Sequence, residues 1–439
     1  MVTFLPTRTG RLADVPSFDR AIGGAESNVV CVLAAAGHAT RWVSRVGADG
    51  FGDHLVAAIG GYGVDVASVR RDPARPTGIY FRTAGDRAGD NHEVAYYRAG
   101  SAASAMTVDN VDPAALRAAR VLHLSGITAA LSDGCLDLLR ALTAPRPGRR
   151  PLVSFDVNFR PGLWRDAAAP RVLLDLARGC DLVFVGADEA EAAWGVTADP
   201  DAIRALLPEP RILVVKEGAR GATVFERADA ADTDGAGGVV RADAVDAIRA
   251  GGAHRARGAG GAHGVDPVGG PGRSRDVGGA GNAWSERTGS ESGPARTVSA
   301  SGRTIRPATA PDTRAPVPAP DTRAPVSAPD TGTPVPASDT RTSVPALRVD
   351  VVAPVGAGDA FAAGFLSATL RGLPVRDRIR SGHLMAAAVL TVPGDLAVPP
   401  SRDHADRLLA LDDAAWGRLR LGPGWTHAAG RADEEVPTP

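Results

Sequence analysis

The chain has 439 residues and a formal net charge of −1 at pH 7. This length is enough for one large α/β domain or for two smaller ones, and the near-neutral charge gives no electrostatic reason to expect binding to nucleic acid or to a membrane surface. No apolar run approaches the roughly 20 residues of a membrane span, no secretory leader is recognisable, and the few scattered cysteines form neither a metal-spaced pair nor a disulfide framework. We therefore expect a cytoplasmic protein.

A glycine-rich turn precedes the first expected helix, at residues 29–36. Gly23 and Gly24 permit a ligand to approach the backbone closely, and Asn28 can bind hydroxyl groups through both atoms of its amide. A plain turn with an asparagine cap is the alternative. The segment is therefore a candidate ligand-binding turn.

An alternating stretch that ends at Tyr96-Tyr97-Arg98 predicts a strand whose side chains point to opposite faces in turn. Tyr96 and Arg98 then share a face. A tyrosine hydroxyl beside a guanidinium suits a polyhydroxylated acid, because arginine can hold a carboxylate by two parallel hydrogen bonds. An exposed strand with ordinary surface residues is the alternative.

Short, continuous apolar runs alternate with Ala- and Leu-rich helical stretches over residues 20–228. This alternation predicts buried parallel strands in a doubly wound α/β sheet, with ligands beyond the carboxyl ends of the strands. The expected strands are 121–124, 152–155, 182–185 and 212–215, and examples of the expected helices are 133–142 and 168–178.

Polar residues follow two of these strands. Arg160 lies in a polar segment, residues 156–161, after the second strand, and is a second candidate for binding an acid group. Asp188, Glu189 and Glu191 follow the third strand, where carboxylates could order Mg²⁺ and its waters. An acidic first helical turn is the alternative for these carboxylates.

Lys216 follows the fourth strand and is the only lysine of the chain. The glycines of this segment, Gly218 and Gly221, would let a nucleotide lie against the backbone. No Walker-type G-x-x-x-x-G-K-[ST] loop is present, which excludes a P-loop kinase on this criterion.

The composition changes at residue 229. Residues 229–346 are rich in Gly, Ala, Pro, Ser and Arg, with almost no aromatic side chains, and end in a nine-residue repeat with aspartates at 312, 321, 330 and 339. Such a segment cannot bury enough apolar surface to offset chain entropy, which predicts a disordered insertion. The globular part is thus expected over 1–228 and 347–425, with a polar tail at 426–439.

The segment Gly356-Ala357-Gly358-Asp359 opens an apolar run of helical spacing at residues 361–369. The free N–H groups of the small residues would converge at the positive end of a helix, a place that binds phosphate. A carboxylate beside that place repels phosphate, so its expected role is to take a proton from an attacking hydroxyl. A simple helix cap is the alternative for Asp359.

Taken together and in this order, these segments resemble the ribokinase-like (PfkB) carbohydrate kinase family. Within that family the chain is most similar to 2-dehydro-3-deoxygluconate kinases. The resemblance covers roughly residues 3–228 and 346–412, and the Gly-Ala-Gly-Asp signature is its most specific motif. The segments that carry it are 23–28, 46–52, 75–80, 96–102, 156–164 and 356–361.

The resemblance implies a three-layer α/β/α fold with a mostly parallel central sheet and a small β lid built from strands near residues 12–20 and 77–97. It implies Asp359 as catalytic base, with Gly356, Ala357 and Gly358 as anion hole. Glu189 would organise Mg²⁺ through water. The residues implied for the sugar are Gly23, Gly24, Asn28, Tyr80, Tyr96, Arg98 and Arg160, and those implied for ATP are Lys216, Gly218 and Gly221.

The family uses Mg-ATP, often responds to a monovalent cation such as K⁺, and commonly dimerises through its lids, so we expect these properties here. Three departures stand out. Ala353 replaces a usual acidic residue, and Gly186 replaces a usual asparagine, which should weaken the organisation of metal or phosphate. Family members also usually place an apolar strand before the segment that matches Thr3–Pro6, so we expect exposed apolar edges in the sheet.

The main hypothesis is an ATP-dependent kinase that phosphorylates a primary hydroxyl of a sugar acid, 2-dehydro-3-deoxy-D-gluconate, to its 6-phosphate. A kinase of a neutral sugar such as fructose or ribose is the alternative within the class. A non-catalytic binding protein with the same fold is a rival from another class. A dinucleotide-binding oxidoreductase is weakly supported, because no early G-x-G-x-x-G motif with a matching acidic residue is present.

Overall fold

The computed structural model describes residues 1–8, 10–83, 93–145, 151–164, 168–227 and 339–427. Among these residues no helix is both long and apolar enough to cross a membrane. The helices are α1 (Ala25–Ala35), α2 (Gly50–Gly61), α3 (Pro113–Arg117), α4 (Gly126–Ala129), α5 (Asp133–Thr143), α6 (Ala169–Arg178), α7 (Ala187–Trp194), α8 (Pro200–Leu206), α10 (Ala357–Leu370), α11 (Val375–Leu390), α12 (Arg402–Leu409) and α13 (Asp413–Arg418), with short 3₁₀ turns at Ala102–Ala105, Pro161–Leu163, Gly218–Arg220 and Trp425–His427.

The central sheet has six strands in the order β12-β11-β10-β9-β8-β7. Four of them are parallel, and β11 and β12 are antiparallel to their neighbours. The parallel strands begin where the apolar runs predict them, so this part of the prediction is confirmed. The strands are β7 (Val121–Ser125), β8 (Leu152–Asp156), β9 (Leu182–Gly186), β10 (Ile212–Lys216), β11 (Gly221–Arg227) and β12 (Asp339–Pro345).

Alternate residues of the central strands face two separate apolar cores, which makes the structure three-layered. Leu182 and Phe184 of β9 pack into a core with α1, α10, α11 and α12. Val183 and Val185 of the same strand pack into a second core with α5, α6, α7 and α8. Because both faces are covered, the strands are continuously apolar rather than alternating.

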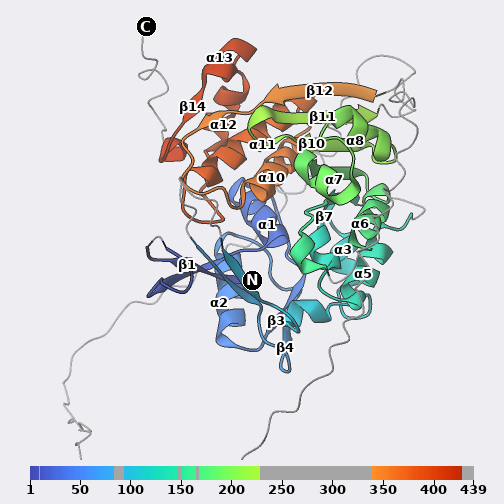
Figure 1. Cartoon of the computed structure of the whole chain (residues 1–439), viewed down its shortest axis with the longest axis vertical. Coiled ribbons are helices and arrows are strands. Elements are labelled where there is room, and N and C mark those ends of the chain that lie inside the picture. Colours follow the sequence, from blue (N-terminus) through green and yellow to red (C-terminus); the bar gives the residue numbers. More distant parts are fainter. Residues whose placement is uncertain (9, 84–92, 146–150, 165–167, 228–338, 428–439) are drawn as a thin grey trace, which may run out of the picture. The chain divides into compact units, whose positions relative to one another are not determined.

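Helices α10 and α11 pack closely in the first of these cores (Figure 1). A side chain at Gly364 would collide with the carbonyl oxygen of Ser381, so glycine is needed for this approach. Figure 1 also shows α1 beside α10, although more than 300 residues separate them in the sequence. The pair brings Asn28 next to Asp359, which matters for the site described below.

A second sheet has four strands in the order β2-β1-β5-β6. It contains β1 (Val2–Pro6), β2 (Phe18–Ile22), β5 (Ile79–Arg82) and β6 (Val94–Tyr97). β5 and β6 lie within the expected lid segment, whereas β2 begins at Phe18, so most of the segment expected at 12–20 is not strand. We call this sheet the lid.

Two strand pairs complete the described part. β3 (Ser44–Gly47) pairs in parallel with β4 (Val69–Asp72), and β13 (Arg348–Val349) pairs with β14 (Arg420–Leu421). β13 is only two residues long.

The expected end of the insertion at residue 346 needs correction. β12 (Asp339–Pro345) forms a seven-residue antiparallel ladder with β11. Its sequence repeats the polar Asp-Thr-Arg unit found at residue 312, so composition alone did not distinguish it. Residues 229–338 and 428–439, the other part of the expected insertion and the polar tail, lie outside the described residues.

A buried ion pair fixes the start of β12. Arg204 Nε lies 2.6 Å from Asp339 Oδ2, and both side chains are 0% exposed. Arg204 also donates to the carbonyl oxygens of Leu207 and Pro210. We predict that Asp339→Ala, which leaves the guanidinium buried and without its counterion, lowers the free energy of unfolding by roughly 3–5 kcal/mol.

The exposed salt bridge between Arg11 and Asp14 provides the control. Asp14→Ala should leave the free energy of unfolding almost unchanged, because solvent screens an exposed ion pair. Chemical denaturation of both variants measures the difference, and equal effects would show that β12 does not hold this position in solution.

Candidate active site

The N-terminus of α10 is built to receive an anion. Gly356, the residue before the helix, has φ of 79°, and a side chain there would lie 2.5 Å from the carbonyl oxygen of Asp395. The first hydrogen bond of the helix runs from the amide of Ala360 to the carbonyl oxygen of Gly356. The amides of Ala357 and Gly358 therefore precede the helical ladder, at the positive end of the helix.

Asp359 stands in the first turn of α10 and lines a cavity. Asn28 of α1 donates a hydrogen bond from Nδ2 to Asp359 Oδ2 over 2.9 Å. The pKa of Asp359 is raised to about 7: burial is the largest cause and the charge of Asp156 adds to it, while the hydrogen bond from Asn28 and the charge of Lys216 oppose the rise. A carboxyl with a pKa near neutrality is suited to accept and return a proton at physiological pH.

Lys216, at the end of β10, is next to this helix terminus. Its Nζ lies 2.9 and 3.1 Å from the two carboxylate oxygens of Asp156, and 3.6 Å from the place of a Cβ on Gly358. Burial lowers the pKa of Lys216, but Asp156 and Glu189 outweigh it and the net shift is upward. The side chain is therefore a positive charge held against the anion-binding amides.

Glu189 in the first turn of α7 bridges the ends of two strands. Its carboxylate accepts hydrogen bonds from the amides of Gly186, over 2.9 Å, and Phe159. Arg160 lies 3.9 Å away. Burial raises the pKa of Glu189, while Lys216 lowers it. The carboxylate is thus fixed by backbone amides rather than free to move.

Tyr80 and Asp395 meet at the base of the lid. The hydroxyl of Tyr80 donates to Asp395, and Arg82 forms a buried ion pair with the same carboxylate at 2.9 Å. A side chain at Gly23 would collide with the hydroxyl of Tyr80, which explains the glycine. Burial raises the pKa of Tyr80, so the phenol stays protonated.

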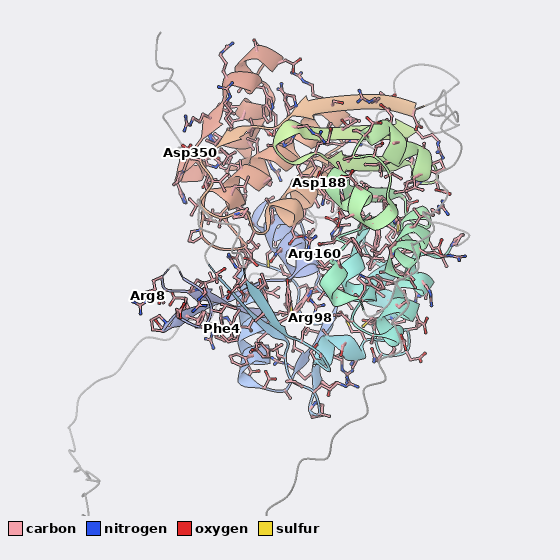
Figure 2. All side chains as sticks on the ribbon, in the orientation of Figure 1. Phe4, Arg8, Arg98, Arg160, Asp188 and Asp350 are labelled. Carbon is pink, nitrogen blue, oxygen red and sulfur yellow. The ribbon has the colours of Figure 1, made fainter. Side chains whose placement is uncertain are left out.

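The side chains predicted to bind an acid group, Tyr96, Arg98 and Arg160, line the same cavity as Asp359. The guanidinium of Arg98 is 5.8 Å from the ring centroid of Tyr96, and the ring of Tyr80 is 5.6 Å from that of Tyr96. Arg160 is 58% exposed and donates to the carbonyl oxygen of Phe159. Arg98 directly follows β6 of the lid, and Arg160 comes four residues after β8 of the central sheet. Figure 2 labels both side chains.

One cavity of about 1330 Å³ brings most of the predicted residues together. Gly23 and Gly221 are not among its lining residues in the described part of the chain. Gly221 instead begins β11, where a side chain would collide with a carbonyl oxygen of β12. The predicted residues that line the cavity are Gly24, Asn28, Tyr80, Tyr96, Arg98, Arg160, Glu189, Lys216, Gly218, Gly356, Ala357, Gly358 and Asp359.

Sequence reasoning missed three carboxylates that line this cavity. Asp395 follows a Pro-Gly turn without a recognisable motif, and Glu26 was read only as part of the glycine turn. Thr128 of α4 donates a hydrogen bond to Glu26. Asp156 follows a predicted strand, and that position was the only signal available for it.

Two residues that line the cavity each carry a buried amide oxygen without a hydrogen-bond partner among the described residues: Asn28 Oδ1 and Asn158 Oδ1. Asn158 also has φ of 44°, a backbone conformation unusual for a residue other than glycine. Unpaired buried acceptors are costly, so both atoms are suited to accept hydrogen bonds from a ligand.

Two of the three departures from the family pattern, Gly186 and Ala353, lie close to this site. Gly186 donates its amide hydrogen to Glu189, so the backbone still positions that carboxylate without an asparagine side chain. Ala353 is 5% exposed and has no ionisable group. Among the described residues, no cluster of three or more histidine, cysteine, aspartate or glutamate side chains could hold a metal ion.

Comparison with known proteins places the chain in a family. The model of the pfkB family carbohydrate kinases matches residues 2–256 and 325–402, more than half of the chain. A 2-dehydro-3-deoxygluconokinase of Thermoproteus tenax is 36% identical over 49% of this chain and 66% of its own length. The corresponding enzyme of Bacillus subtilis is 36% identical over 44% of this chain and 60% of its own length. The chain thus spans less than two thirds of these relatives.

Fructokinase-1 of Zea mays is 30% identical over 54% of this chain and 77% of its own length. Among solved structures, a PfkB protein from Polaromonas sp. JS666 is 25% identical, with a TM-score of 0.57 over 92% of this chain and 96% of that one. A 2-dehydro-3-deoxygluconokinase from Thermotoga maritima shares the fold, with a TM-score of 0.56 and 19% identity over 94% of this chain and 96% of that one. The chain belongs to the PfkB family of carbohydrate kinases and has the ribokinase-like α/β fold.

Proposed function

We propose that the protein is an ATP-dependent kinase of a sugar acid, with 2-dehydro-3-deoxy-D-gluconate as the preferred substrate and its 6-phosphate as the product. One observation carries the proposal. Asp359, with a pKa raised to about 7, stands in the same helical turn as the amides of Ala357 and Gly358. A base and an anion site in one turn are what transfer of a phosphoryl group to an alcohol requires.

Asp359 takes the proton of the primary hydroxyl, and Asn28 keeps its carboxylate aimed at the cavity. The oxygen then forms a bond to phosphorus, and the bond between that phosphorus and the bridging oxygen breaks. When bound, ATP supplies the phosphoryl group, and ADP leaves with the electron pair of the broken bond. The amides of residues 356–358 stabilise the negative charge that develops on the transferred group.

The residues present fit a nucleotide with Mg²⁺. Lys216 places a positive charge beside the helix terminus, and Gly218 at the cavity wall has no side chain to obstruct a ligand. Glu189 accepts hydrogen bonds from two backbone amides, so we expect it to orient waters of the metal ion rather than to bind the ion directly. A requirement for K⁺ stays a prediction.

The acid end of the substrate is assigned to Arg98 and Arg160. Both line the cavity, and the carboxylate of Glu26, which lines it too, acts on Arg98 electrostatically. A carboxylate between two guanidinium groups gains charge-assisted hydrogen bonds that a neutral sugar does not. Asn28 Oδ1 and Asn158 Oδ1 are available for hydroxyl groups.

A coupled assay of ADP formation tests the proposal with ketodeoxygluconate and fructose as acceptors. We expect a higher kcat/KM with the acid. A higher value with fructose would instead support the neutral-sugar kinase suggested by the fructokinase relatives. No ADP formation with either sugar, together with binding of the acid, would support a non-catalytic protein of this fold.

We predict that Arg98→Leu reduces kcat/KM for ketodeoxygluconate by about 10- to 100-fold, because loss of a charged hydrogen bond costs roughly 1.5–3 kcal/mol. The value for fructose should change much less. Arg171→Leu is the control, since Arg171 is 87% exposed on α6. An equal loss with both sugars would show that Arg98 does not bind the carboxylate.

Dimerisation through the lid and a cytoplasmic location also stay predictions. β2 and β6 are the edge strands of the lid, so these are the strands that could meet a second copy.

A further inference from the structure

The loop that follows α11 carries a buried carboxylate, that of Asp395, which the proposed mechanism does not use. Its side chain is 4% exposed. Its partners are Tyr80 and Arg82, both on the lid strand β5: the hydroxyl of Tyr80 donates to Asp395, and Arg82 forms an ion pair with it at 2.9 Å. Because Asp395 and Tyr80 are more than 300 residues apart in the sequence, these contacts join two distant parts of the chain.

Arg82 strengthens the connection between this loop and the lid. Its guanidinium is also buried, and it donates a hydrogen bond over 2.9 Å to the carbonyl oxygen of Pro393. Leu396 packs against the apolar core that contains Val2 of the lid, and also against the core of α10 and α11. The loop at residues 393–396 is therefore held to the lid by an ion pair, hydrogen bonds and apolar contacts.

The backbone of the same loop packs against the anion-binding turn. A Cβ on Gly356 would lie 2.5 Å from the carbonyl oxygen of Asp395 and 3.2 Å from its Cα, so the two backbones are in direct contact. The carbonyl oxygen of Leu390, at the end of α11, accepts hydrogen bonds from the amides of Val352 and Ala353. The segment after α11 thus contacts both the turn and the chain that leads into it.

The contacts of Tyr80 continue toward the residues assigned to the acid group. The ring of Tyr80 lies 5.6 Å from that of Tyr96, and the guanidinium of Arg98 lies 5.8 Å from the ring of Tyr96. These three side chains line the cavity together with Asp395. One continuous set of contacts therefore runs from the acid site, through Asp395, to the anion-binding turn.

We propose that Asp395 is a positioning residue for phosphoryl transfer. Its side chain anchors the loop to β5, and its backbone holds Gly356 so that the amides of the turn stay aimed at the transferred group. This inference rests on the proposed function, because it assigns the turn to the phosphoryl group. Amides stabilise a developing charge only when they are correctly placed, and a displacement of about 1 Å can reduce turnover about 100-fold.

Tyr80→Phe is the mildest test, because it removes one hydroxyl and leaves the ring beside Tyr96. The ion pair between Arg82 and Asp395 also stays in place. We expect kcat with ketodeoxygluconate to fall about tenfold, while the dissociation constant of the sugar acid, measured by calorimetry, changes less than about twofold. Tyr97→Phe, at a lid residue that is 64% exposed, is the matched control and should keep wild-type kcat.

The opposite result for Tyr80→Phe would overturn the proposal. A weaker affinity for the sugar acid with unchanged kcat would show that the hydroxyl acts on the sugar itself and not through Asp395.

A mimic of the transferred phosphoryl group tests the turn without turnover. The probe is aluminium fluoride with ADP and Mg²⁺, in the presence of the sugar acid. Tyr80→Phe and Asp395→Asn should bind ADP as the wild type does, and should lose affinity for ADP with aluminium fluoride by the same factor as kcat. A purely structural role would lower the melting temperature and leave the ratio of the two affinities unchanged, which would contradict the proposal.

A double-mutant cycle tests whether Tyr80 acts through Asp395. Asp395→Asn should reduce kcat about 100-fold, and Tyr80→Phe should add less than about twofold in that background. Independent losses that multiply would overturn the proposal. Asp395→Asn leaves Arg82 buried without a counterion, so Arg82→Met is added if the single variant does not fold. If neither folds, the fluoride titration of Tyr80→Phe still decides.

Failure of the positioning role and failure of the proposed function give different results. A wild-type protein that phosphorylates neither sugar refutes the proposed function. An active wild type whose Tyr80→Phe and Asp395→Asn variants keep its kcat refutes only the positioning role of Asp395.

Discussion

Replacement of Asp359 by asparagine should reduce turnover with ketodeoxygluconate by about 10²- to 10⁴-fold, the contribution expected of a positioned general base. Asparagine has nearly the same size and retains a group that can bind the amide of Asn28. It cannot accept the proton of the substrate hydroxyl. Binding of the sugar acid and of ATP, measured by calorimetry, should therefore change little.

Asp53→Asn is the matched control, because Asp53 also stands in the first turn of a helix, α2, but is 75% exposed beside Arg71. Its turnover should equal that of the wild type. If Asp359→Asn keeps wild-type turnover, Asp359 is only a helix cap, and the proposed mechanism is wrong.

The same substitution should make the protein more stable above neutral pH. Because the pKa of Asp359 is raised from 3.8 to about 7 in the folded protein, the folded state binds a proton between these values that the unfolded state has released. Stability is therefore lost as the pH rises from about 4 to 7. Solvent in the cavity reduces the effect, so we expect Asp359→Asn to gain about 1–2 kcal/mol at pH 8.

Replacement of Lys216 by methionine should have a comparably large effect on turnover. Lys216 supplies the positive charge beside the anion-binding amides, and removal of one such group costs about 10²- to 10³-fold in turnover in other enzymes. The affinity for ATP should fall as well. Because Asp156 would be left buried without its partner, stability should fall by roughly 3–5 kcal/mol.

A double variant separates the two roles of Lys216. Asp156→Asn in the Lys216→Met background removes the unpaired charge, so stability should recover while turnover stays low. Recovery of both would show that Lys216 only neutralises Asp156 and does not act on phosphate.

Lys216 also allows a direct measurement, because it is the only lysine of the chain. An acyl phosphate of ATP transfers its acyl group to a lysine amine near the phosphates and releases the nucleotide. Acylation should occur at Lys216 and should be prevented by excess ATP. Acylation only at the N-terminus, or acylation insensitive to ATP, would place the nucleotide elsewhere.

The sequence predicted the central parallel strands and the helix that carries Asp359, because both depend on local apolar periodicity. It predicted the lid less well. β1 and β2 have only five residues each, and β1 also pairs with β5, which lies far along the chain. β12 was missed because a polar edge strand resembles the repeat before it and is stabilised by the distant Arg204.

In the candidate site, too, the sequence predicted what depends on a local segment and not what depends on contacts between distant residues. The motif at residues 356–359 predicted the base and the anion-binding turn together, because both lie in one local segment. Asp395 could not be predicted, since its partners Tyr80 and Arg82 lie more than 300 residues away in the sequence. The role of Asn28 also differs in detail: its amide nitrogen binds Asp359, and only its oxygen is left for a substrate.

The dependence of kcat/KM on pH tests the central claim most directly, because this quantity reports the ionisation of groups in the free enzyme. For the wild type with ketodeoxygluconate, kcat/KM should rise as the pH passes about 7, where Asp359 loses its proton. The residual activity of Asp359→Asn should lack this rise. A rise at the same pH in both proteins would show that another group accepts the proton, and would contradict the account.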